Sequence, residues 1–265
     1  MIAEEETIKG LTELAVEIAE EAGSLLLERF GTRATNVSTK DTPTDPVSDA
    51  DRDAQELILS LIRRARPNDG VISEEGDPRR TDSGVTWIVD PLDGTVNFLY
   101  GIPEWGVSIA VYDEQGPVAG VVCNPCRGET FMAGRGAGAS LNGSPIRVSD
   151  KSELAVALIG TGFSYDADAR SEQARRLVGL LPRVRDIRRC GSAALDLAAV
   201  ACGRLDGFFE APMKLWDRAA GELLIKEAGG VIEPLTPPFG QDTGVIASGP
   251  ALHAALMKEV LRERE

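Results

Sequence analysis

Apolar positions near the start of the chain recur at spacings of three and four, which predicts an amphipathic helix. The repeat consists of Ile8, Leu11, Leu14, Ala15, Ile18, Ala22, Leu25, Leu26 and Phe30. Gly31 follows as a C-terminal stop. Residues 32–47 are rich in Thr, Pro and Asp, and we expect an extended loop or hairpin there. A second helix is predicted to start near Ser48 or Asp49, which are both good N-cap residues.

The middle of the chain changes to short apolar runs separated by turns, which predicts β-strands. The runs cover residues 71–72, 85–89, 105–112, 117–123 and 129–133. Because the turns between the later runs are tight, successive strands are expected to pair as an antiparallel meander. Beyond about residue 150, apolar runs alternate with helical repeats, which indicates a layered α/β arrangement. We therefore expect an N-terminal α+β half over residues 1–150 and a C-terminal α/β half over residues 151–265.

The charge balance narrows the classes of partner. Lys and Arg residues number 28 and Asp and Glu residues 42, so the net charge is −14. Such an acidic chain repels phosphate backbones, which argues against broad nucleic-acid binding. Its many carboxylates suit hard cations such as magnesium.

His253 is the single histidine, which excludes metal sites made of several histidines. A Ser-His-Asp or Cys-His mechanism would depend on this residue alone, and its place in the last helical repeat predicts a surface position. The four cysteines are too few for a disulfide framework. The N-terminal letters MIAEEET lack an apolar signal core, and no run approaches the ~18 apolar residues of a membrane span. We therefore expect a cytoplasmic protein without membrane contacts.

The most informative segment reads WIVDPLDGT. An apolar strand ends at Asp90, Pro91 is expected to break that strand, and Asp93 follows three positions after the first Asp. Two carboxylates at a strand end can share a cation, and the N–H groups of Gly94 and Thr95 can hold a phosphate at the start of the next helix. An Asp-Pro/Asp-Gly turn that caps this helix explains the segment equally well.

Two other places carry carboxylates in similar positions. Glu74 and Glu75 follow the short run at residues 71–72, and Asp217 stands at the predicted start of a helix. Each has a simpler explanation when taken alone, a solvated loop for the glutamates and an N-cap for Asp217. Together with the two aspartates of the DPLD motif, Glu74 and Asp217 are candidates for one acidic pocket. Several carboxylates around two or more magnesium ions suit in-line displacement at phosphorus by an activated water.

The motifs resemble those of the inositol monophosphatase family, the magnesium-dependent and lithium-sensitive phosphomonoesterases. WIVDPLDGTVNF is similar to the first signature of the family and LWDRAAGELLIKEAGG to the second, and ISEEG matches upstream. The order and separation of these segments also match, and the resemblance covers nearly the whole chain. It implies an α/β (α+β) fold, a layered αβαβα sandwich with an antiparallel N-terminal sheet and a mixed C-terminal sheet. It also implies a homodimer.

The resemblance further implies roles for individual residues. It assigns two or three magnesium ions to Glu74, Asp90, Asp93, Asp217 and the carbonyl of Leu92. It assigns the substrate contacts to Asp93, Gly94, Thr95, Gly191, Ser192, Ala193 and Glu210. The implied catalytic residues are Thr95, which would orient the attacking water, Asp51, which would help it, and Glu74. Lys40 stands where the family has a loop lysine near the metals.

Without the resemblance, several of these residues have ordinary explanations. Lys40 fits a surface lysine, and Asp51 fits a helix first-turn charge. Gly191 and Ser192 fit the start of a helix, and Glu210 fits a charge at the end of a strand.

Three functions remain open. The first is hydrolysis of inositol monophosphate or a similar small polyol phosphate, which the residues Val96, Asn97 and Phe98 after DGT favour within the family. The second is hydrolysis of fructose 1,6-bisphosphate, histidinol phosphate or a 3′-phosphonucleotide by the same superfamily chemistry. The third is a regulatory role as a binding partner of the transcription machinery, as some bacterial relatives have. The net charge favours a protein partner over RNA, and the only local counter-indication is a basic stretch, Arg183, Arg185, Arg188 and Arg189.

Two weaker motifs favour structural interpretations. Cys123 and Cys126 form a CxxC, which a redox pair or half of a zinc site would also show. No second pair exists, and the motif lies in a predicted turn of the meander. The glycine-rich letters GRGAG at residues 134–138 lack the strand–turn–helix context of a nucleotide-binding loop and indicate a turn in the sheet.

Overall fold

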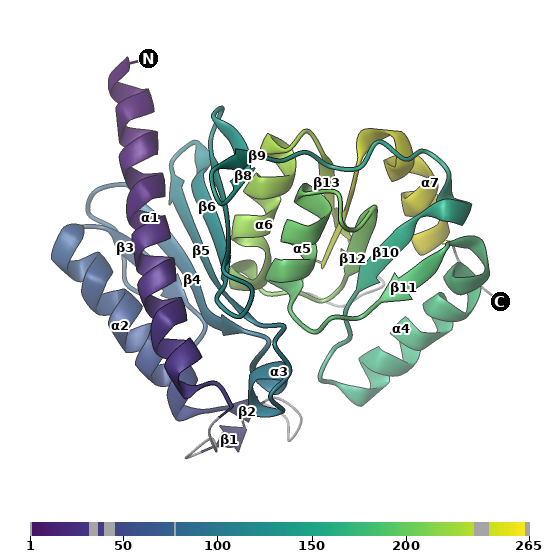
Figure 1. Ribbon diagram of the computed structural model, residues 1–265, viewed down its shortest axis with the longest axis horizontal. Coiled ribbons are helices and arrows are strands. Elements are labelled where there is room, and N and C mark those ends of the chain that lie inside the picture. Colours follow the sequence, from purple (N-terminus) through teal and green to yellow (C-terminus); the bar gives the residue numbers. More distant parts are fainter. Residues whose placement is uncertain (1, 32–36, 40–45, 77, 236–243, 263–265) are drawn as a thin grey trace.

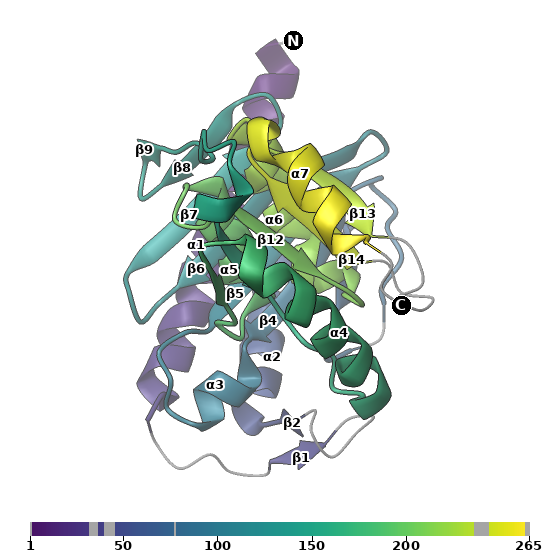
Figure 2. The same ribbon diagram turned by 90° about the vertical axis from the view of Figure 1, so that its right-hand side faces the viewer.

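The computed structural model describes residues 2–31, 37–39, 46–76, 78–235 and 244–262. Figure 1 shows the elements stacked from helices α1 and α2, through a first sheet, helices α5 and α6 and a second sheet, to helices α4 and α7. The outer pair α4 and α7 covers the far face of the second sheet, which Figure 2 shows from that side. The helices are α1 (Ile2–Arg29), α2 (Asp49–Ala65), α4 (Ala167–Leu180), α5 (Ala193–Ala201), α6 (Leu215–Glu227) and α7 (Pro250–Val260). The mixed α/β class expected from the sequence is confirmed.

The first sheet has seven strands in the order β3-β4-β5-β6-β7-β8-β9. They are β3 (Gly70–Ser73), β4 (Thr86–Asp93), β5 (Gly106–Asp113), β6 (Gly116–Asn124), β7 (Glu129–Gly134), β8 (Gly138–Leu141) and β9 (Ser144–Pro145). The predicted antiparallel meander is confirmed from β4 to β9. The pair β3–β4 differs because it is parallel. Parallel pairing requires a crossover, and the chain between these strands supplies it.

The second sheet is mixed, as expected, with the order β11-β10-β12-β14-β13. Its strands are β10 (Leu158–Thr161), β11 (Asp186–Arg188), β12 (Gly207–Glu210), β13 (Val231–Leu235) and β14 (Gly244–Ser248). Strand β10 runs parallel to β11 and β12, whereas β14 pairs antiparallel with β12 and β13. Shorter elements are β1 (Ser38–Thr39), its antiparallel partner β2 (Pro46–Val47), α3 (Thr95–Leu99), η1 (Leu154–Val156) and η2 (Leu181–Arg183).

The apolar alternation along β5 explains how the first sheet is covered on both faces. Val107, Ile109 and Val111 belong to the core beneath α1 and α2, whereas Ala110 belongs to the core shared with α5 and α6. All four are buried. Because successive side chains of a strand point to opposite faces, one apolar strand can serve both cores. Helix α6, from the C-terminal half of the chain, therefore packs directly on the sheet of the N-terminal half.

Two sequence-based expectations were wrong. Strand β4 does not end before Pro91 but continues to Asp93, with a register shift between Asp90 and Asp93 in its pairing with β5. Such a bulge takes the proline, which has no N–H, out of the hydrogen-bond ladder. His253 is not a surface residue: it is 7% exposed, and its Nδ1 lies 3.0 Å from Ser248 Oγ. Helix α7 lies against the second sheet, and this face of the helix is therefore hidden from water.

The two weaker motifs are structural. The GRGAG turn joins β7 to β8, and the N–H groups of Gly136 and Gly138 donate to the Glu227 carboxylate at 2.8 and 2.9 Å. This anion-binding turn is thus occupied by a side chain of the protein itself. In the CxxC, both cysteines are free, and burial raises the pKa of the Cys123 thiol to about 11. A thiol with a raised pKa is a poor nucleophile and a poor metal ligand.

Among the helices described here, none is both long and apolar enough to cross a lipid bilayer.

Candidate active site

The predicted site residues converge where the carboxyl end of β4 meets the starts of three helices. Strand β4 supplies Asp90 and Asp93, and the turn after it leads into α3. Helix α2 contributes its first turn, as does α6, and the loop before α5 approaches from the other half of the chain. Glu210 comes from the end of β12. Segments that are far apart in the sequence therefore build one site.

Asp51 and Thr95 are 44 residues apart and form a direct hydrogen bond. Thr95 Oγ1 lies 2.9 Å from Asp51 Oδ1 and 3.1 Å from the carbonyl oxygen of Leu92. Asp51 also accepts from the backbone N–H and the hydroxyl of Ser48, at 2.8 and 2.6 Å, in the capping box of α2. Asp51 is thus a helix first-turn carboxylate and a site residue at once. Both side chains are buried, so this pair is fixed rather than rearranging in solvent.

Asp90 is 2% exposed, and one of its oxygens accepts from the N–H of Leu92 at 3.1 Å. Burial raises its pKa well above the ordinary range, and the nearby carboxylates of Glu74, Asp93 and Asp217 raise it further. Asp90 also shares a hydrogen bond with the side chain of Glu74, which requires a proton between the two carboxyl groups. The four carboxylates of the predicted cluster therefore lie close enough to repel one another.

Asp93 is held by the loop that precedes α5. Its Oδ2 accepts from Ser192 Oγ at 2.5 Å and from the N–H of Ala194 at 2.7 Å. Burial raises the pKa of Asp93, although these hydrogen bonds and the Arg189 guanidinium oppose the rise. The predicted substrate loop at Gly191–Ser192 thus contacts a predicted metal ligand directly.

Glu210 and Asp217 complete the cluster. Burial, followed by repulsion from Asp196 and Asp93, raises the pKa of Glu210 to about 8. Burial also raises the pKa of Asp217 well above its ordinary range, with contributions from Asp93 and Glu74. Asp217 is not the N-cap residue of α6, which is Lys214; it is the third residue of the helix, and its Oδ2 accepts from the N–H of Lys214 at 2.8 Å.

The donor set fits a hard divalent cation. All the groups are oxygens, and the charged neighbours that raise the pKa of Asp90 are carboxylates. A cation among them would compensate the repulsion that the raised pKa values report. Within the described part of the chain, no three Asp, Glu, His or Cys side chains are arranged so that they could hold a metal ion by themselves. Magnesium does not need such an arrangement, because it usually takes one or two carboxylates together with waters and substrate phosphate oxygens.

Lys40 lies outside the described residues, so its predicted place near the metals stays a prediction. Three residues near the site were not singled out from the sequence as site residues: Asn97, Arg189 and Asp196. Arg189 acts electrostatically on Asp93, Asp196 and Glu210. The only sequence signals were a polar residue within the apolar letters TVNFL and an acidic one within AALDLAAVA. A polar residue in an apolar helix is often directed at a partner from another element.

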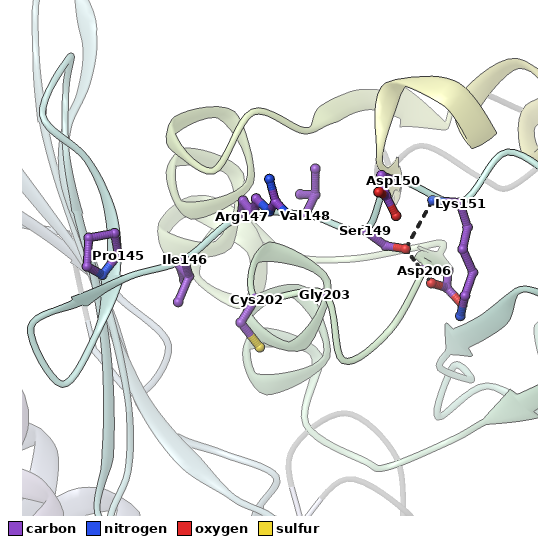
Figure 3. Close-up of a pocket in the computed structure, with 10 residues that line it drawn as sticks. All are labelled: Pro145, Ile146, Arg147, Val148, Ser149, Asp150, Lys151, Cys202, Gly203 and Asp206. Carbon is purple, nitrogen blue, oxygen red and sulfur yellow. Dashed lines mark hydrogen bonds and ion pairs between the residues drawn. The ribbon is translucent and has the colours of Figure 1, made fainter.

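A cavity of about 450 Å³ lies elsewhere and contains none of the predicted site residues. Its lining, drawn in Figure 3, is Pro145, Ile146, Arg147, Val148, Ser149, Asp150, Lys151, Cys202, Gly203 and Asp206. There the Asp206 carboxylate accepts from Ser149 Oγ at 2.6 Å and from Lys151 Nζ at 2.9 Å. Because these partners satisfy the Asp206 carboxylate and Asp150 is exposed to water, this cavity does not gather buried carboxylates as the β4 site does.

The chain is similar in sequence and in fold to known proteins. The sequence model of the inositol monophosphatase family matches residues 8–265. The chain is 42% identical to the Nus factor SuhB of Escherichia coli (strain K12) over 225 residues, which cover 84% of each protein. It is 40% identical to the inositol-1-monophosphatase of Mycobacterium leprae (strain TN) over 237 residues, covering 85% of this chain and 81% of that protein. The crystal structure of the extragenic suppressor protein suhB from Bartonella henselae superposes with a TM-score of 0.89 at 37% identity, over 96% of this chain and all of that one.

Proposed function

Because this chain belongs to the inositol monophosphatase family, we propose that it is a magnesium-dependent phosphomonoesterase that hydrolyses inositol monophosphate or a similar small polyol phosphate. The observation that carries the proposal is the mutual repulsion of Glu74, Asp90, Asp93 and Asp217 beside the hydrogen-bonded pair of Asp51 and Thr95. A phosphate monoester needs its negative charge neutralised, and a cluster of buried carboxylates that repel one another is the place to bind cations for that purpose.

The residues that would hold two or three magnesium ions are Glu74, Asp90, Asp93, Asp217 and the carbonyl of Leu92. When bound, magnesium neutralises the phosphate, lowers the pKa of a bound water and stabilises the leaving alkoxide.

Thr95 and Asp51 would position the attacking water. The Thr95 hydroxyl has one proton, and both of its contacts, Asp51 Oδ1 and the Leu92 carbonyl, are acceptors. The hydroxyl therefore donates inward, which leaves its oxygen lone pairs to accept a proton from a water on the pocket side. In this way Asp51, itself fixed by Ser48, would orient the water through Thr95. As the water passes a proton to Thr95 Oγ1, the Thr95 hydroxyl would pass its own proton to Asp51. Glu74, beside Asp90, would assist them.

The substrate would lie across the two halves of the chain. The N–H groups of Gly94 and Thr95 would hold the phosphate, and Asp93, Gly191, Ser192, Ala193 and Glu210 would contact the hydroxyl groups. Gly94 has φ of +92°, a left-handed conformation that favours glycine and turns the chain sharply into α3. Such fixed contacts hold the ester in line for attack. We further propose that the protein acts as a cytoplasmic homodimer.

A second candidate function is a regulatory role as a binding partner of the transcription machinery. The observation that favours it is the 42% identity to proteins named Nus factor SuhB. The net charge of −14 favours a protein partner over RNA for this role, and the exposed arginines Arg183, Arg185, Arg188 and Arg189 are the local exception. Binding that survives loss of Asp90 would separate this role from catalysis.

Phosphate release from a panel of esters tests the proposal. The panel contains inositol 1-phosphate, fructose 1,6-bisphosphate, histidinol phosphate and a 3′-phosphoadenosine nucleotide, each with and without magnesium. We expect magnesium-dependent release that falls about 100-fold or more in Asp93→Asn, a loss of the size seen when one charge-stabilising group is removed. Asp168→Asn, an exposed carboxylate in the first turn of α4, is the matched control. The ester from which phosphate is released fastest identifies the preferred substrate. If folded protein releases phosphate from none of the esters, the enzymatic proposal is rejected.

A further inference from the structure

Asn97 is a buried polar side chain that the proposed mechanism leaves without a role. It lies in α3, two residues after Thr95, and is 6% exposed. Its Nδ2 donates to the carbonyl of Glu104 at 2.6 Å and to the carbonyl of Cys190 at 2.8 Å. Both partners are carbonyl oxygens, so only the amide nitrogen can face them. Asn97 therefore joins the phosphate turn to a segment 93 residues further along the chain.

The segment to which Asn97 donates its hydrogen bond is also the segment that orients Asp93. Cys190 is followed by Gly191, which has φ of +97°, and then by Ser192, whose hydroxyl binds Asp93. A Cβ added to Gly191 would meet the two amide atoms of Asn97 at 2.7 and 3.0 Å, so the amide packs directly on this glycine. The Asn97 amide thus fixes one side of the loop. The other side of the loop binds Asp93, so the position of the loop determines the orientation of that carboxylate.

The phosphate turn touches the same place. A Cβ on Gly94 would lie 3.1 Å from the carbonyl of Glu104 and 3.3 Å from that of Gly191. The backbones of the turn, of Glu104 and of the Gly191 loop therefore approach one another closely, beside the Cβ of Trp105. Asn97 supplies two N–H groups from a single atom at this junction, which an aspartate or an aliphatic residue of the same size cannot do.

We propose that Asn97 is a positioning residue that sets the distance between the phosphate turn at Gly94–Thr95 and the substrate-hydroxyl loop at Gly191–Ala193. This inference rests on the proposed function, because it concerns the fit of an ester that spans both segments. An ester whose hydroxyl groups reach the Gly191 loop depends on this distance. An ester that offers only its phosphate makes no contact with the loop and depends on it only through Asp93, a dependence that saturating magnesium offsets.

The test compares Asn97→Asp with wild type on two esters, inositol 1-phosphate and p-nitrophenyl phosphate, at saturating magnesium. Asn97→Asp keeps the size of the side chain and replaces the donor by a third acceptor. We expect kcat/KM for inositol 1-phosphate to fall at least 10-fold, mainly through KM, and that for p-nitrophenyl phosphate to fall less than 3-fold. Asn97→Ala, which removes the donor without adding charge, is the second variant if Asn97→Asp does not fold.

The matched control is Asn142→Asp. Asn142 Nδ2 also donates to a carbonyl, that of Gly128 at 2.9 Å, but in the turn after β8. This control should leave both esters within 2-fold of wild type. An equal loss on both esters in the Asn97 variants, or none on either, overturns the positioning role.

Amide hydrogen exchange provides a readout that does not need activity. In Asn97→Asp, amides of residues 191–196 should exchange at least 10-fold faster than in wild type, while those of β5 and β6 stay unchanged. If wild type hydrolyses neither ester, the proposed function fails, and this exchange pattern alone decides whether Asn97 holds the loop. Unchanged exchange over residues 191–196 rejects the inference whatever the kinetics show.

Discussion

Asp69 and Asp90 lie at opposite ends of the β3–β4 strand pair, and each is 2% exposed, yet the fold surrounds them in opposite ways. Asp69 accepts from Arg66 Nε at 2.8 Å, Ser83 Oγ at 2.6 Å and Trp87 Nε1 at 2.9 Å. Burial alone would raise its pKa, but these hydrogen bonds hold the pKa below its ordinary value. Burial also raises the pKa of Asp90, and there the carboxylate neighbours add to the rise.

The difference separates a structural carboxylate from a candidate ligand. The chain itself supplies the donors that satisfy Asp69, so this residue contributes to stability. Around Asp90 the chain supplies mostly further acceptors, which leaves negative charge to be compensated by a ligand from solution. Residue type and exposed fraction are the same in both places, so these two properties do not separate the carboxylates, whereas their neighbours do.

The largest expected effect is that of Asp90→Asn, which removes one charge from the cluster. Activity should fall about 100-fold or more, because charge stabilisation at the phosphate is lost. Thermal unfolding in the presence of EDTA should occur at a higher temperature than in wild type, since one repulsive buried charge is gone. Magnesium should stabilise wild type by about 2.7 kcal/mol at 100 times its dissociation constant, and the variant much less. A lower unfolding temperature with retained activity would make Asp90 a structural residue like Asp69.

A smaller effect of opposite kind is expected from Asp69→Asn. The change weakens the bonds from Arg66 and Trp87, and the buried indole N–H is left poorly satisfied, so stability should fall by about 2 kcal/mol. Arg66 is 38% exposed, which keeps the loss below that of a fully buried pair. Urea unfolding gives the stability, and kcat/KM per folded molecule should match wild type. A loss of activity comparable to that of Asp90→Asn would remove the distinction between the two carboxylates.

The smallest effect is the pH dependence of the Asp69 contribution. Because the pKa of Asp69 is lower in the folded protein than its ordinary ~3.9, its stabilisation is present above that pH and is lost as pH falls through the folded value. The stability difference between wild type and Asp69→Asn should be constant from pH 5 to 7 and shrink by less than about 1 kcal/mol by pH 3.5.

Glu210 should behave in the opposite direction. Its pKa is raised to about 8, so its contribution is greatest below ~4.3 and is lost as pH rises toward 8. Measured in EDTA, Glu210→Gln should gain stability relative to wild type as pH rises from 5 to 9. For Asp69, a stability difference between wild type and Asp69→Asn that grew as the pH fell would show that the assigned direction of the Asp69 pKa shift is wrong.

Local patterns predicted most elements because they depend on neighbours in the sequence. The start of α2 at Asp49 after Ser48 follows from a capping preference, and β5 to β7 follow from apolar runs and tight turns. The passage of β4 through Pro91 and the burial of His253 were missed. Both depend on other elements, the register with β5 in one case and the sheet beneath α7 in the other.

The sequence by itself determined the fold class, the family and the residue types of the candidate site, because periodicity and the two signature segments are properties of consecutive residues. It did not determine which carboxylates are satisfied. Three hydrogen bonds join segments 44 to 99 residues apart: Thr95 to Asp51, Asn97 to the carbonyl of Cys190, and Ser192 to Asp93. Such contacts, and the pKa shifts they cause, depend on distances through space and on exclusion of water, and only the tertiary structure decides these.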